Sequence, residues 1–362
     1  DVGEVRMCKR IMKYQTAEKG DIPFFKISTL GGRPDAFISR TIYESYKEKY
    51  NYPQSGDILL SAAGTIGRAV IFDGAPSYFQ DSNIVWIENT ESLLLNNLLY
   101  YIYRDLSWVT ESGTIPRIYN SIVRSINFPI PINKEEQSRI AAALTSVDDL
   151  ISALDKLIEK KKNIKQGSMQ LLLTGKKRLK GFTDPWVEKK MGSIEIQNGA
   201  MLNSTEYKAG NIPVIAGGKQ PAGYHSSSNR LANTITISAS GANAGYISFY
   251  KGPIFASDCS TINEQKGISI EFLYYCLLLR QNAIYKCQTG GAQPHIHAKD
   301  IKDIGFAMPS DISEQKRIAS IIESMDDEIS SLETKKAKYE QVKQGMMQQL
   351  LTGKIRLIEE LA

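Results

Sequence analysis

The sequence is poor in the residues on which disulfide-linked and membrane-spanning proteins depend. Its 4 cysteines are Cys8, Cys259, Cys276 and Cys287, and no two of them show C-x-x-C spacing. We therefore expect no disulfide framework. Scattered free thiols are typical of the reducing cytosol, which predicts a cytoplasmic protein. No apolar run approaches the roughly 18 residues of a membrane span. The longest run, residues 272–279, is predicted to form a buried helix.

Motifs of several enzyme classes are also missing. No Pro-Pro dipeptide occurs, so the sequence lacks the Asn/Asp-Pro-Pro-aromatic loop of amino-methyltransferases. A Pro-Asp pair stands at 34–35, but no acid-x-Lys follows within 25 residues to complete a Mg²⁺-dependent nuclease core. Thr-Gly-Lys at 174–176 and 352–354 lacks the Ser/Thr that a phosphate loop requires.

Histidine is scarce as well, with 3 in the chain. His295 and His297 would point to one face of a strand, but no Cys, Asp or Glu at ligand spacing completes a metal site. So few histidines also give poor support to a Ser/His/Asp triad. We therefore expect no catalytic residues and no bound metal.

The composition is that of an ordinary globular protein. Hydrophobic residues make up 42% and charged residues 23% of the 362 residues, and the net charge is +5. This length predicts two or three domains. The mild positive charge permits a polyanionic partner without requiring one.

An internal repeat organises the chain. Residues 131–179 align with 309–357 without a gap, and 25 of the 49 aligned residues are identical. Weaker matches join 61–64 to 238–241, and 20–23 to 210–213. The matched part reads as a long helix and has hardly changed, whereas the globular part ahead of it has diverged.

The repeat predicts the order globule, helix, globule, helix, with boundaries at 1–131, 132–180, 181–308 and 309–362. The fold class is α/β: two mixed α/β globules separated by two long antiparallel coiled-coil-like helices, related by a pseudo-two-fold internal repeat. Short strands bounded by Gly or Pro are expected at 57–60, 69–72, 84–87, 234–238 and 246–249.

Each helix would run for about 40 residues, or about 60 Å. Asn133 with Glu136, and Asp311 with Glu314, have the spacing of capping boxes, and Gly175 and Gly353 would end the helices. Apolar residues recur with heptad-like spacing, which predicts packing of one helix on the other. They are Ala143, Val147, Leu150, Leu154, Leu157, Ile164 and Leu171 in the first helix, and Ile318, Ile322, Met325, Ile329, Leu332, Tyr339, Val342 and Met346 in the second. An ordinary helical hairpin with no further role remains the alternative.

Basic and amide side chains are frequent in the Gly/Ser-rich loops of both globules. Arg and Lys can read guanine edges, and Asn and Gln adenine edges, in the DNA major groove. The candidates for DNA binding are Arg33, Arg40, Thr65, Arg68, Arg117, Asn120, Asn229, Arg230, Asn243, Gln293, His295 and Lys299. A basic stretch at 156–180 could contact phosphates. Ordinary surface solvation is the competing interpretation of each residue.

These motifs carry a family resemblance over essentially the whole length. Pro-x-x-x-x-Glu-Gln-x-Arg-Ile-Ala occurs at 131–141 and 309–319, and Leu-Leu-Thr-Gly-Lys-x-Arg-Leu at 172–179 and 350–357. With the Asp-Pro-Trp at 184–186, they make the chain resemble the specificity subunit of type I restriction–modification enzymes. The first copy has no matching Trp before Gly3.

The resemblance implies a non-catalytic subunit with two target-recognition domains that read the two unlike halves of a bipartite DNA target. It implies two methylation subunits as partners, joined by restriction subunits in complexes that cut DNA, with S-adenosylmethionine, ATP and Mg²⁺ on those partners and no cofactor here. The helix residues expected to dock partners are Glu136, Gln137, Arg139, Leu172, Leu173, Glu314, Gln315, Arg317, Leu350 and Leu351. The rival hypotheses are a nuclease or methyltransferase with an unrecognised site, and a structural coiled-coil protein.

Overall fold

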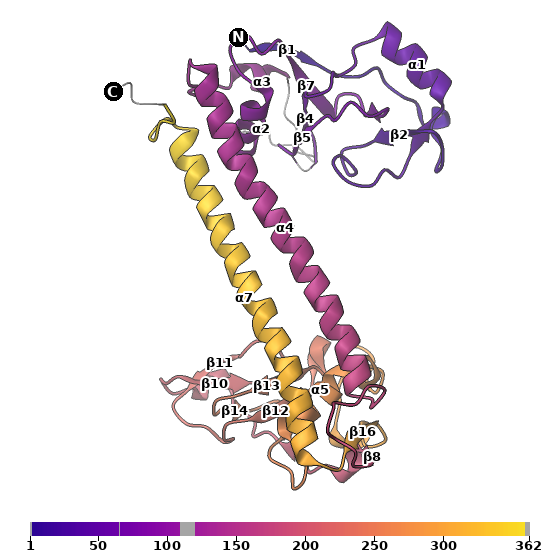
Figure 1. The fold of residues 1–362 in the computed structure, drawn as a ribbon, viewed down its shortest axis with the longest axis vertical. Helices are drawn as coiled ribbons and strands as arrows, with labels where there is room; N and C mark the ends of the chain where they lie inside the picture. Colours follow the sequence, from indigo (N-terminus) through magenta and orange to yellow (C-terminus); the bar gives the residue numbers. More distant parts are fainter. Residues whose placement is uncertain (1, 65, 109–119, 359–362) are drawn as a thin grey trace. The chain divides into compact units, whose positions relative to one another are not determined.

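The computed structural model describes residues 2–64, 66–108 and 120–358. The chain forms two compact units, each built from non-adjacent parts of the repeat. Unit 1 consists of Asp1–Leu154 and Lys335–Ala362, and unit 2 consists of Asp155–Thr334. The helices α4 (Lys134–Leu172) and α7 (Ile312–Leu350) have 39 residues each and are unbroken (Figure 1). Each unit therefore contains one globule and a segment of both long helices.

Unit 1 holds two small sheets. A four-stranded sheet has the order β1-β7-β4-β5, and a three-stranded sheet has the order β3-β2-β6. The strands are β1 (Gly3–Arg6), β2 (Ile22–Phe25), β3 (Phe37–Ile38), β4 (Ile58–Ser61), β5 (Ala69–Ile71), β6 (Tyr78–Phe79) and β7 (Ile84–Asn89). The helices are α1 (Arg40–Lys49), α2 (Asn96–Asp105) and α3 (Asn120–Ser125), with a 3-10 turn at Lys13–Gln15. In Figure 1, α2 and α3 lie on the side of the larger sheet that carries α4, and α1 lies on the other side.

Unit 2 repeats this plan and adds a ribbon. Its sheets have the orders β13-β12-β15-β9, β11-β10-β14 and β16-β8. The strands are β8 (Trp186–Lys190), β9 (Gln197–Asn198), β10 (Ile212–Ile215), β11 (Gly223–His225), β12 (Thr234–Ser238), β13 (Ile247–Tyr250), β14 (Phe255–Ala256), β15 (Cys259–Ile262) and β16 (Gly305–Pro309). The helices are α5 (Ile270–Leu279) and α6 (Gln281–Tyr285), with 3-10 turns at Met191–Ser193, Ser204–Glu206, Gly241–Asn243 and Ala298–Asp300.

The two globules share one topology. Each four-stranded sheet is antiparallel, with β9, β15, β12 and β13 standing where unit 1 has β1, β7, β4 and β5. In each three-stranded sheet one pair is antiparallel and the other is parallel. The repeat thus extends through the divergent part of the chain. All five predicted strands are present within two residues of their predicted bounds, and the apolar run at 272–279 is the buried helix α5.

The N-cap residues of the long helices are as predicted, but the capping boxes are not. The Asn133 and Asp311 side chains each accept a backbone N–H of the first turn, from Glu135 at 2.8 Å and Ser313 at 2.7 Å. The capping boxes are wrong, however, because the Glu136 and Glu314 side chains bond to distant arginines instead. Gly175 and Gly353 have φ values of +69° and +72°, the left-handed conformation that ends a helix.

The predicted heptad stripe of the first helix is also partly wrong. Leu157, Ile164 and Leu171 are 37%, 46% and 44% exposed. The buried face carries Leu154 from the predicted stripe, together with Ile140, Leu144, Ile158 and Met169, which the stripe did not include. An α-helix has 3.6 residues per turn, so a strict period of seven drifts around it, and a sequence with apolar residues on two neighbouring stripes leaves the register open. In α7, Val342 is exposed and the neighbouring Lys343 is buried. No helix among the described residues is long and apolar enough to cross a membrane.

Candidate nucleic-acid interface

Ion pairs with a buried glutamate join the two long helices inside each unit, at the motifs that the repeat preserves. In unit 1, Arg356 donates to both carboxylate oxygens of Glu136 at 2.7 Å. In unit 2, Arg178 donates to both oxygens of Glu314 at 2.8 and 2.7 Å. Bidentate contacts of this kind are the strong form of the ion pair. The arginine hydrogen bonds lower the pKa of the Glu136 carboxyl.

The next residue of each motif makes a buried glutamine cluster. In unit 1, Gln137 accepts the Leu95 N–H and donates to the carbonyls of Leu93 and Pro131 at 2.8 and 2.7 Å. In unit 2, Gln315 accepts the Ser269 N–H and donates to the carbonyls of Gly267 and Pro309. Both glutamine side chains are fully buried, so each fixes the start of its helix to the turn that leads into α2 or α5.

A third matched cluster lies farther along each helix. Lys343 donates to Asp148 at 2.5 Å and stands 5.7 Å from the Tyr101 ring centroid, and the Tyr101 hydroxyl donates to the same aspartate. In unit 2, Lys165, Asp326 and Tyr275 make the corresponding contacts. In the Glu–Arg and Lys–Asp clusters the start of one long helix meets the end of the other, so the two helix segments in each unit run in opposite directions.

These contacts change the interpretation of the predicted docking residues. Glu136, Gln137, Glu314 and Gln315 are buried and bonded inside their own units, so they are not exposed for partner docking. The leucines behave alike, since Leu172, Leu173 and Leu350 are buried and Leu351 is half-buried. Arg139 is half-buried and pairs with Glu135 at 2.8 Å, whereas Arg317 is exposed. The preserved motifs thus make contacts that stabilise each unit internally.

The sequence comparison of the two copies contains a further signal that the sequence analysis missed. Some residues are identical in both copies and yet exposed, so packing inside the units does not explain them. They include the pairs Gln166 and Gln344, Gln170 and Gln348, and Lys176 and Lys354. Identity in both copies combined with an outward position on the helix would have indicated them.

Loops of the two units carry several of the predicted DNA-binding residues. In unit 1, the β2–β3 loop holds Arg33, which is exposed, and meets the β4–β5 loop, where the Arg68 guanidinium donates to the Leu30 carbonyl at 3.1 Å. Arg40 is exposed at the first turn of α1. Thr65 and Arg117 lie outside the described residues, and Asn120 is the first residue of α3.

In unit 2, the matching loops converge with a third. The Ser238 hydroxyl donates to the Gly217 carbonyl at 2.8 Å, which joins the β10–β11 loop to the end of β12. The Gly241 N–H donates to the Pro294 carbonyl at 2.9 Å, which joins the β12–β13 loop to residues 289–297. These joined loops carry Asn243, Gln293 and His295. The cation of Lys219, which the sequence analysis missed, stands 5.3 Å from the Tyr246 ring centroid in the same cluster.

Three other predicted residues of unit 2 lie apart from these loops. Asn229 exchanges two hydrogen bonds with the Ala256 backbone, and Arg230 donates to Thr261 and to the carbonyls of Asn229 and Asn198. The hydrogen bonds of both side chains therefore connect β9, β14 and β15 to the residues ahead of β12. Lys299 is exposed on the 3-10 turn at Ala298–Asp300.

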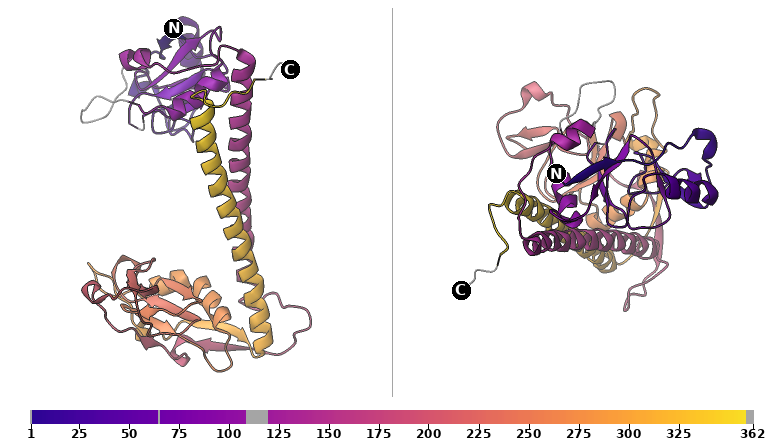
Figure 2. Two further views of the ribbon diagram at one scale, coloured as in Figure 1. Left: turned by 90° about the vertical axis from the view of Figure 1, so that its left-hand side faces the viewer. Right: turned by 90° about the horizontal axis from the view of Figure 1, so that it is seen from above.

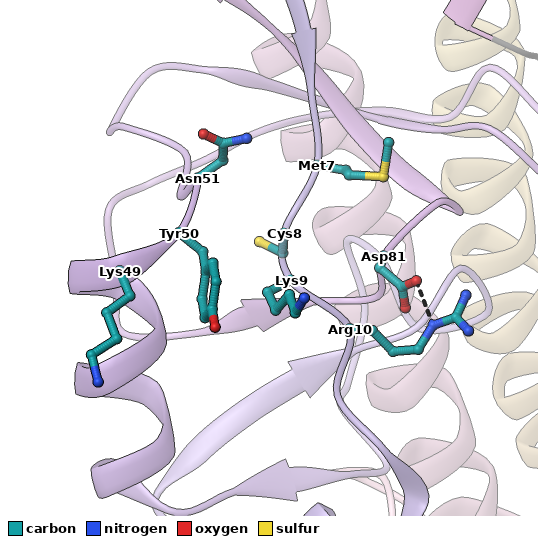
Figure 3. A pocket seen from close by; sticks show the side chains of 8 residues that line it. All are labelled: Met7, Cys8, Lys9, Arg10, Lys49, Tyr50, Asn51 and Asp81. Atoms are coloured by element: carbon teal, nitrogen blue, oxygen red, sulfur yellow. Dashed lines mark hydrogen bonds and ion pairs between the residues drawn. The ribbon is translucent and has the colours of Figure 1, made fainter.

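Unit 1 also has a basic hollow that no motif indicated. A hollow of about 460 Å³ is lined by Lys9, Arg10, Lys49, Tyr50 and Asp81 among others, and Figure 3 shows the Tyr50 ring, at the end of α1, beside Lys9 of the segment that follows β1. Arg10 donates to Asp81 at 2.8 Å. Within the described part of the chain, Lys9 and Lys49 pair with no carboxylate. Such cations suit contacts to a phosphate backbone.

The basic stretch at 156–180 is partly consumed by internal pairing. Lys161 pairs with Glu328 and Lys162 with Glu333, each at 2.6 Å, and Lys165 pairs with Asp326. Arg178 is bound to Glu314. The stretch therefore offers fewer cations to phosphates than its composition predicts.

The thiols and histidines are not arranged as a reactive centre in the described residues. Burial raises the pKa of Cys8, Cys259 and Cys276 to about 12, so these thiols stay protonated near neutral pH. His295 bonds through its backbone to Thr289, and His297 is exposed. No group of three or more His, Cys, Asp or Glu side chains in the described ranges is placed to hold a metal ion.

Known proteins resemble the chain in both sequence and fold. Residues 1–166 and 183–344 match the model of the type I restriction modification DNA specificity domain. A putative type I restriction enzyme specificity subunit of Haemophilus influenzae is 56% identical over 155 residues, which are 42% of this chain and 40% of that protein. The type I restriction enzyme MjaVIII specificity subunit of Methanocaldococcus jannaschii is 26% identical over 341 residues, which are 83% of this chain and 79% of that protein.

Solved structures agree on the fold. The crystal structure of a type I restriction–modification S subunit from M. genitalium superposes with a TM-score of 0.69 at 18% identity, covering 96% of this chain and 93% of that one. A chain solved to explain complex assembly and conformational transition of a type I system gives a TM-score of 0.54 at 15% identity, with 92% of each chain covered.

Proposed function

Because the chain belongs to the family of type I restriction modification DNA specificity domains, we propose that it is the non-catalytic subunit that reads a bipartite, asymmetric DNA target. The observation that carries the proposal is the pair of loop clusters. They occupy the same topological place in two units of one fold but present different side chains. Equivalent positions with unlike chemistry suit two unlike half-sites. Side chains of Arg33 in unit 1, and Asn243 and Gln293 in unit 2, would contact base edges.

The long helices would set the distance between the half-sites. We infer that α4 and α7 form one antiparallel coiled coil related by a pseudo-two-fold axis. The opposite directions of the helix segments in each unit support this arrangement. Such a coil of 39-residue helices would act as a spacer, since each residue adds about 1.5 Å.

The partners in this proposal are two methylation subunits, with restriction subunits where the complex also cuts DNA. The exposed residues identical in both copies, such as Gln166 and Gln344, would form two equivalent docking surfaces. The chemistry would then belong to those partners, which would bind S-adenosylmethionine, ATP and Mg²⁺, while this chain binds none of them.

The test of reading is a methylation map. The chain is assembled with its methylation subunits, and the methylated positions on a random-sequence DNA library are sequenced. Asn243→Ala with Gln293→Ala should relax the preference at one half-site only, and Arg33→Ala at the other. Each lost bidentate base contact lowers discrimination by about 1–3 kcal/mol. Lys266→Ala, an exposed change in the turn between β15 and α5 and outside the joined loops, is the control. Unchanged preferences in the loop variants would refute the assignment.

The test of spacing uses the same map. Deleting residues 154–160 and 332–338 removes seven matched residues from each helix. It shortens the coil by about 10 Å, or about three base pairs at 3.4 Å each. The gap between the half-sites should change accordingly. If the complex with the shortened chain still methylates DNA and the gap between the half-sites is unchanged, the spacer role is excluded.

A further inference from the structure

The entry to α7 in unit 2 is closed by a two-stranded ribbon. Strand β16 runs into α7 and pairs antiparallel with β8, from Gly305 opposite Lys190 to Pro309 opposite Trp186. Bonds from the Met191 N–H to the Ile304 carbonyl and from the Ser310 N–H to the Pro185 carbonyl lie at its two ends. Because antiparallel bonds fall on alternate residues, Phe306 and Met308 are the bonded positions, and Ala307 and Pro309 are not.

Trp186 anchors this ribbon to the ends of both long helices. A Cβ on Gly175 would lie 3.1 Å from the indole, so the ring packs directly on the turn that ends α4. The Arg178 guanidinium stands 5.7 Å from the ring centroid, and the Phe272 ring meets the indole edge-on at 6.4 Å. The tryptophan therefore covers the Arg178–Glu314 pair and the start of α5.

The sheet register shows which part of unit 1 corresponds to this ribbon. Ser61 faces Ile84 in unit 1 as Ser238 faces Cys259 in unit 2. Two residues farther on, Arg6 faces Trp86 and Gln197 faces Thr261, so Arg6 corresponds to Gln197. Counting back four residues from each, Val2 corresponds to Ser193. Strand β8 therefore corresponds to positions ahead of Val2, and β16 corresponds to residues 127–131.

Residues 127–131 have the pattern of N–H groups and prolines that suits pairing with a second strand. By the offset of 178, Phe128 and Ile130 correspond to Phe306 and Met308, the bonded positions. Their N–H groups donate to no residue in the described part of the chain. Pro129 and Pro131 correspond to Ala307 and Pro309, the positions at which the ladder uses no N–H group. Proline, which has no N–H, is thus placed only where it costs no ladder bond.

Two adjoining hollows lie along this segment, and together we call them the strand seat. One, of about 680 Å³, is lined by Val2, Tyr103, Phe128 and Ile130 among others, and the second, of about 490 Å³, is lined by Ile130, Ile132, Gly353 and Arg356 among others.

Three residues around the strand seat have a group that is exposed or that contacts nothing in the described part of the chain. Among the described residues, the buried Tyr103 hydroxyl has no hydrogen-bond partner. Ile132 is 97% exposed. A Cβ on Gly353 would meet nothing within 4 Å, whereas at the matching Gly175 it meets the indole.

We propose that the strand seat of unit 1 binds an extended segment with the chemistry of residues 184–190, joined to the chain ahead of Val2. The segment pairs antiparallel with residues 127–131 and receives the N–H groups of Phe128 and Ile130. Its tryptophan stands seven residues ahead of Val2, as Trp186 stands 193 − 186 = 7 residues ahead of Ser193. The indole packs on Gly353 beneath the Arg356 guanidinium, which completes the Glu136–Arg356 pair as Trp186 completes that of unit 2.

A graft tests the proposal in the full chain. Residues 184–192 are placed directly ahead of Val2, in place of Asp1, and amide exchange is followed by mass spectrometry or NMR. The amides of Phe128 and Ile130 should exchange at least about tenfold more slowly than in the ungrafted chain. Trp186→Ala made in the graft alone should remove most of this protection, and a scrambled graft of the same composition should give none. Equal exchange with and without the graft, or equal protection by the scrambled graft, overturns the proposal.

The native ribbon supplies the reciprocal test. Trp186→Ala at its own position should make the Phe306 and Met308 amides exchange about tenfold faster, as expected of a ribbon that has lost its anchor. Protection of the β10 amides shows that the variant remains folded. Unchanged exchange at Phe306 and Met308 would show that the indole does not hold the strand, and would overturn the anchoring role assigned to it. Neither test depends on DNA binding.

Discussion

Units 1 and 2 are two versions of one fold. Their side chains match in some regions and differ in others. Around the long helices the clusters match residue for residue: Glu136 with Glu314, Gln137 with Gln315, and Lys343 with Lys165. In the loops the side chains differ, with Arg33 and Arg68 in unit 1 and Asn243 and Gln293 in unit 2. The comparison separates residues that hold the fold from residues free to change with the ligand.

The matched clusters also show why the helical motifs change so little. The Glu–Arg and Lys–Asp clusters each take one part from the first copy of the repeat and another from the second, as when Arg356 reaches Glu136. A change in one copy therefore damages the unit that contains the other copy's globule. A change in a loop residue has no such effect on the other copy, because the contacts of the loops stay within one globule.

The largest effect is expected from the glutamine clusters. Gln315→Leu leaves the Ser269 N–H and the carbonyls of Gly267 and Pro309 without their partner in a fully buried place. Each orphaned group costs about 1–3 kcal/mol, so unit 2 should lose about 3 kcal/mol or more of unfolding free energy. Gln137→Leu should destabilise unit 1 by a similar amount.

Hydrogen exchange in each unit, recorded during denaturant unfolding, measures the loss of unfolding free energy in both variants. Lys266→Ala, an exposed substitution, is the control. A large loss in one unit and none in the other would break the equivalence of the two clusters.

A smaller and unequal effect is expected from the arginines. Arg178 has a side chain that is 30% exposed, lies over Trp186 and also donates to the Asp184 carbonyl at 3.0 Å. Arg356 is 51% exposed, and Glu136 keeps a second donor, the Leu357 N–H at 3.1 Å. Arg178→Met should therefore lower the melting temperature of unit 2 more than Arg356→Met lowers that of unit 1. Calorimetry with the two variants decides this, and the reverse order would contradict the argument.

Much of the fold can be read from the sequence, because periodicity and turn residues are local signals. The five strands, helix α5 and the glycines that end α4 and α7 are of this kind. The register of the α4 stripe is not, since Leu157 and Ile158 are both apolar and only packing decides which is buried. The role of Glu136 is hidden for a similar reason: its spacing fits a capping box, but a partner 220 residues away binds it instead.

The candidate interface is less accessible from sequence. Arg230 and Asn229 have the residue types of DNA readers, yet both hold strands together. Nothing in their local sequence distinguishes them from Asn243 and Gln293, because the bonding partners of Arg230 and Asn229 come from strands 27 to 32 residues distant. Lys219 was missed because an isolated lysine in a loop is ordinary until Tyr246 is seen beside it.

A modest difference is expected between the lysines of the third cluster. Without Lys343, Asp148 keeps two donors, the Tyr101 hydroxyl at 3.2 Å and the Arg104 guanidinium at 3.1 Å. Without Lys165, Asp326 keeps the Tyr275 hydroxyl at 3.1 Å. Lys165→Met should thus cost more stability than Lys343→Met, with a difference below about 1 kcal/mol because both aspartates are partly exposed. Paired urea titrations measure it, and equal costs would show that Arg104 contributes nothing.

The smallest effect concerns pH and sharpens the comparison at the Glu136–Arg356 pair. The arginine hydrogen bonds lower the pKa of Glu136 in the folded state below the ordinary value of about 4.3. A depressed pKa adds stability that is fully present above the unfolded pKa and is lost as the pH falls through the folded pKa. The stability gap between the native chain and Glu136→Gln should therefore be constant from pH 7 to about 5 and then narrow as the pH falls. Unfolding free energies of unit 1 at a series of pH values measure this gap, and a gap that widens in acid would show that the carboxylate is not stabilised by Arg356.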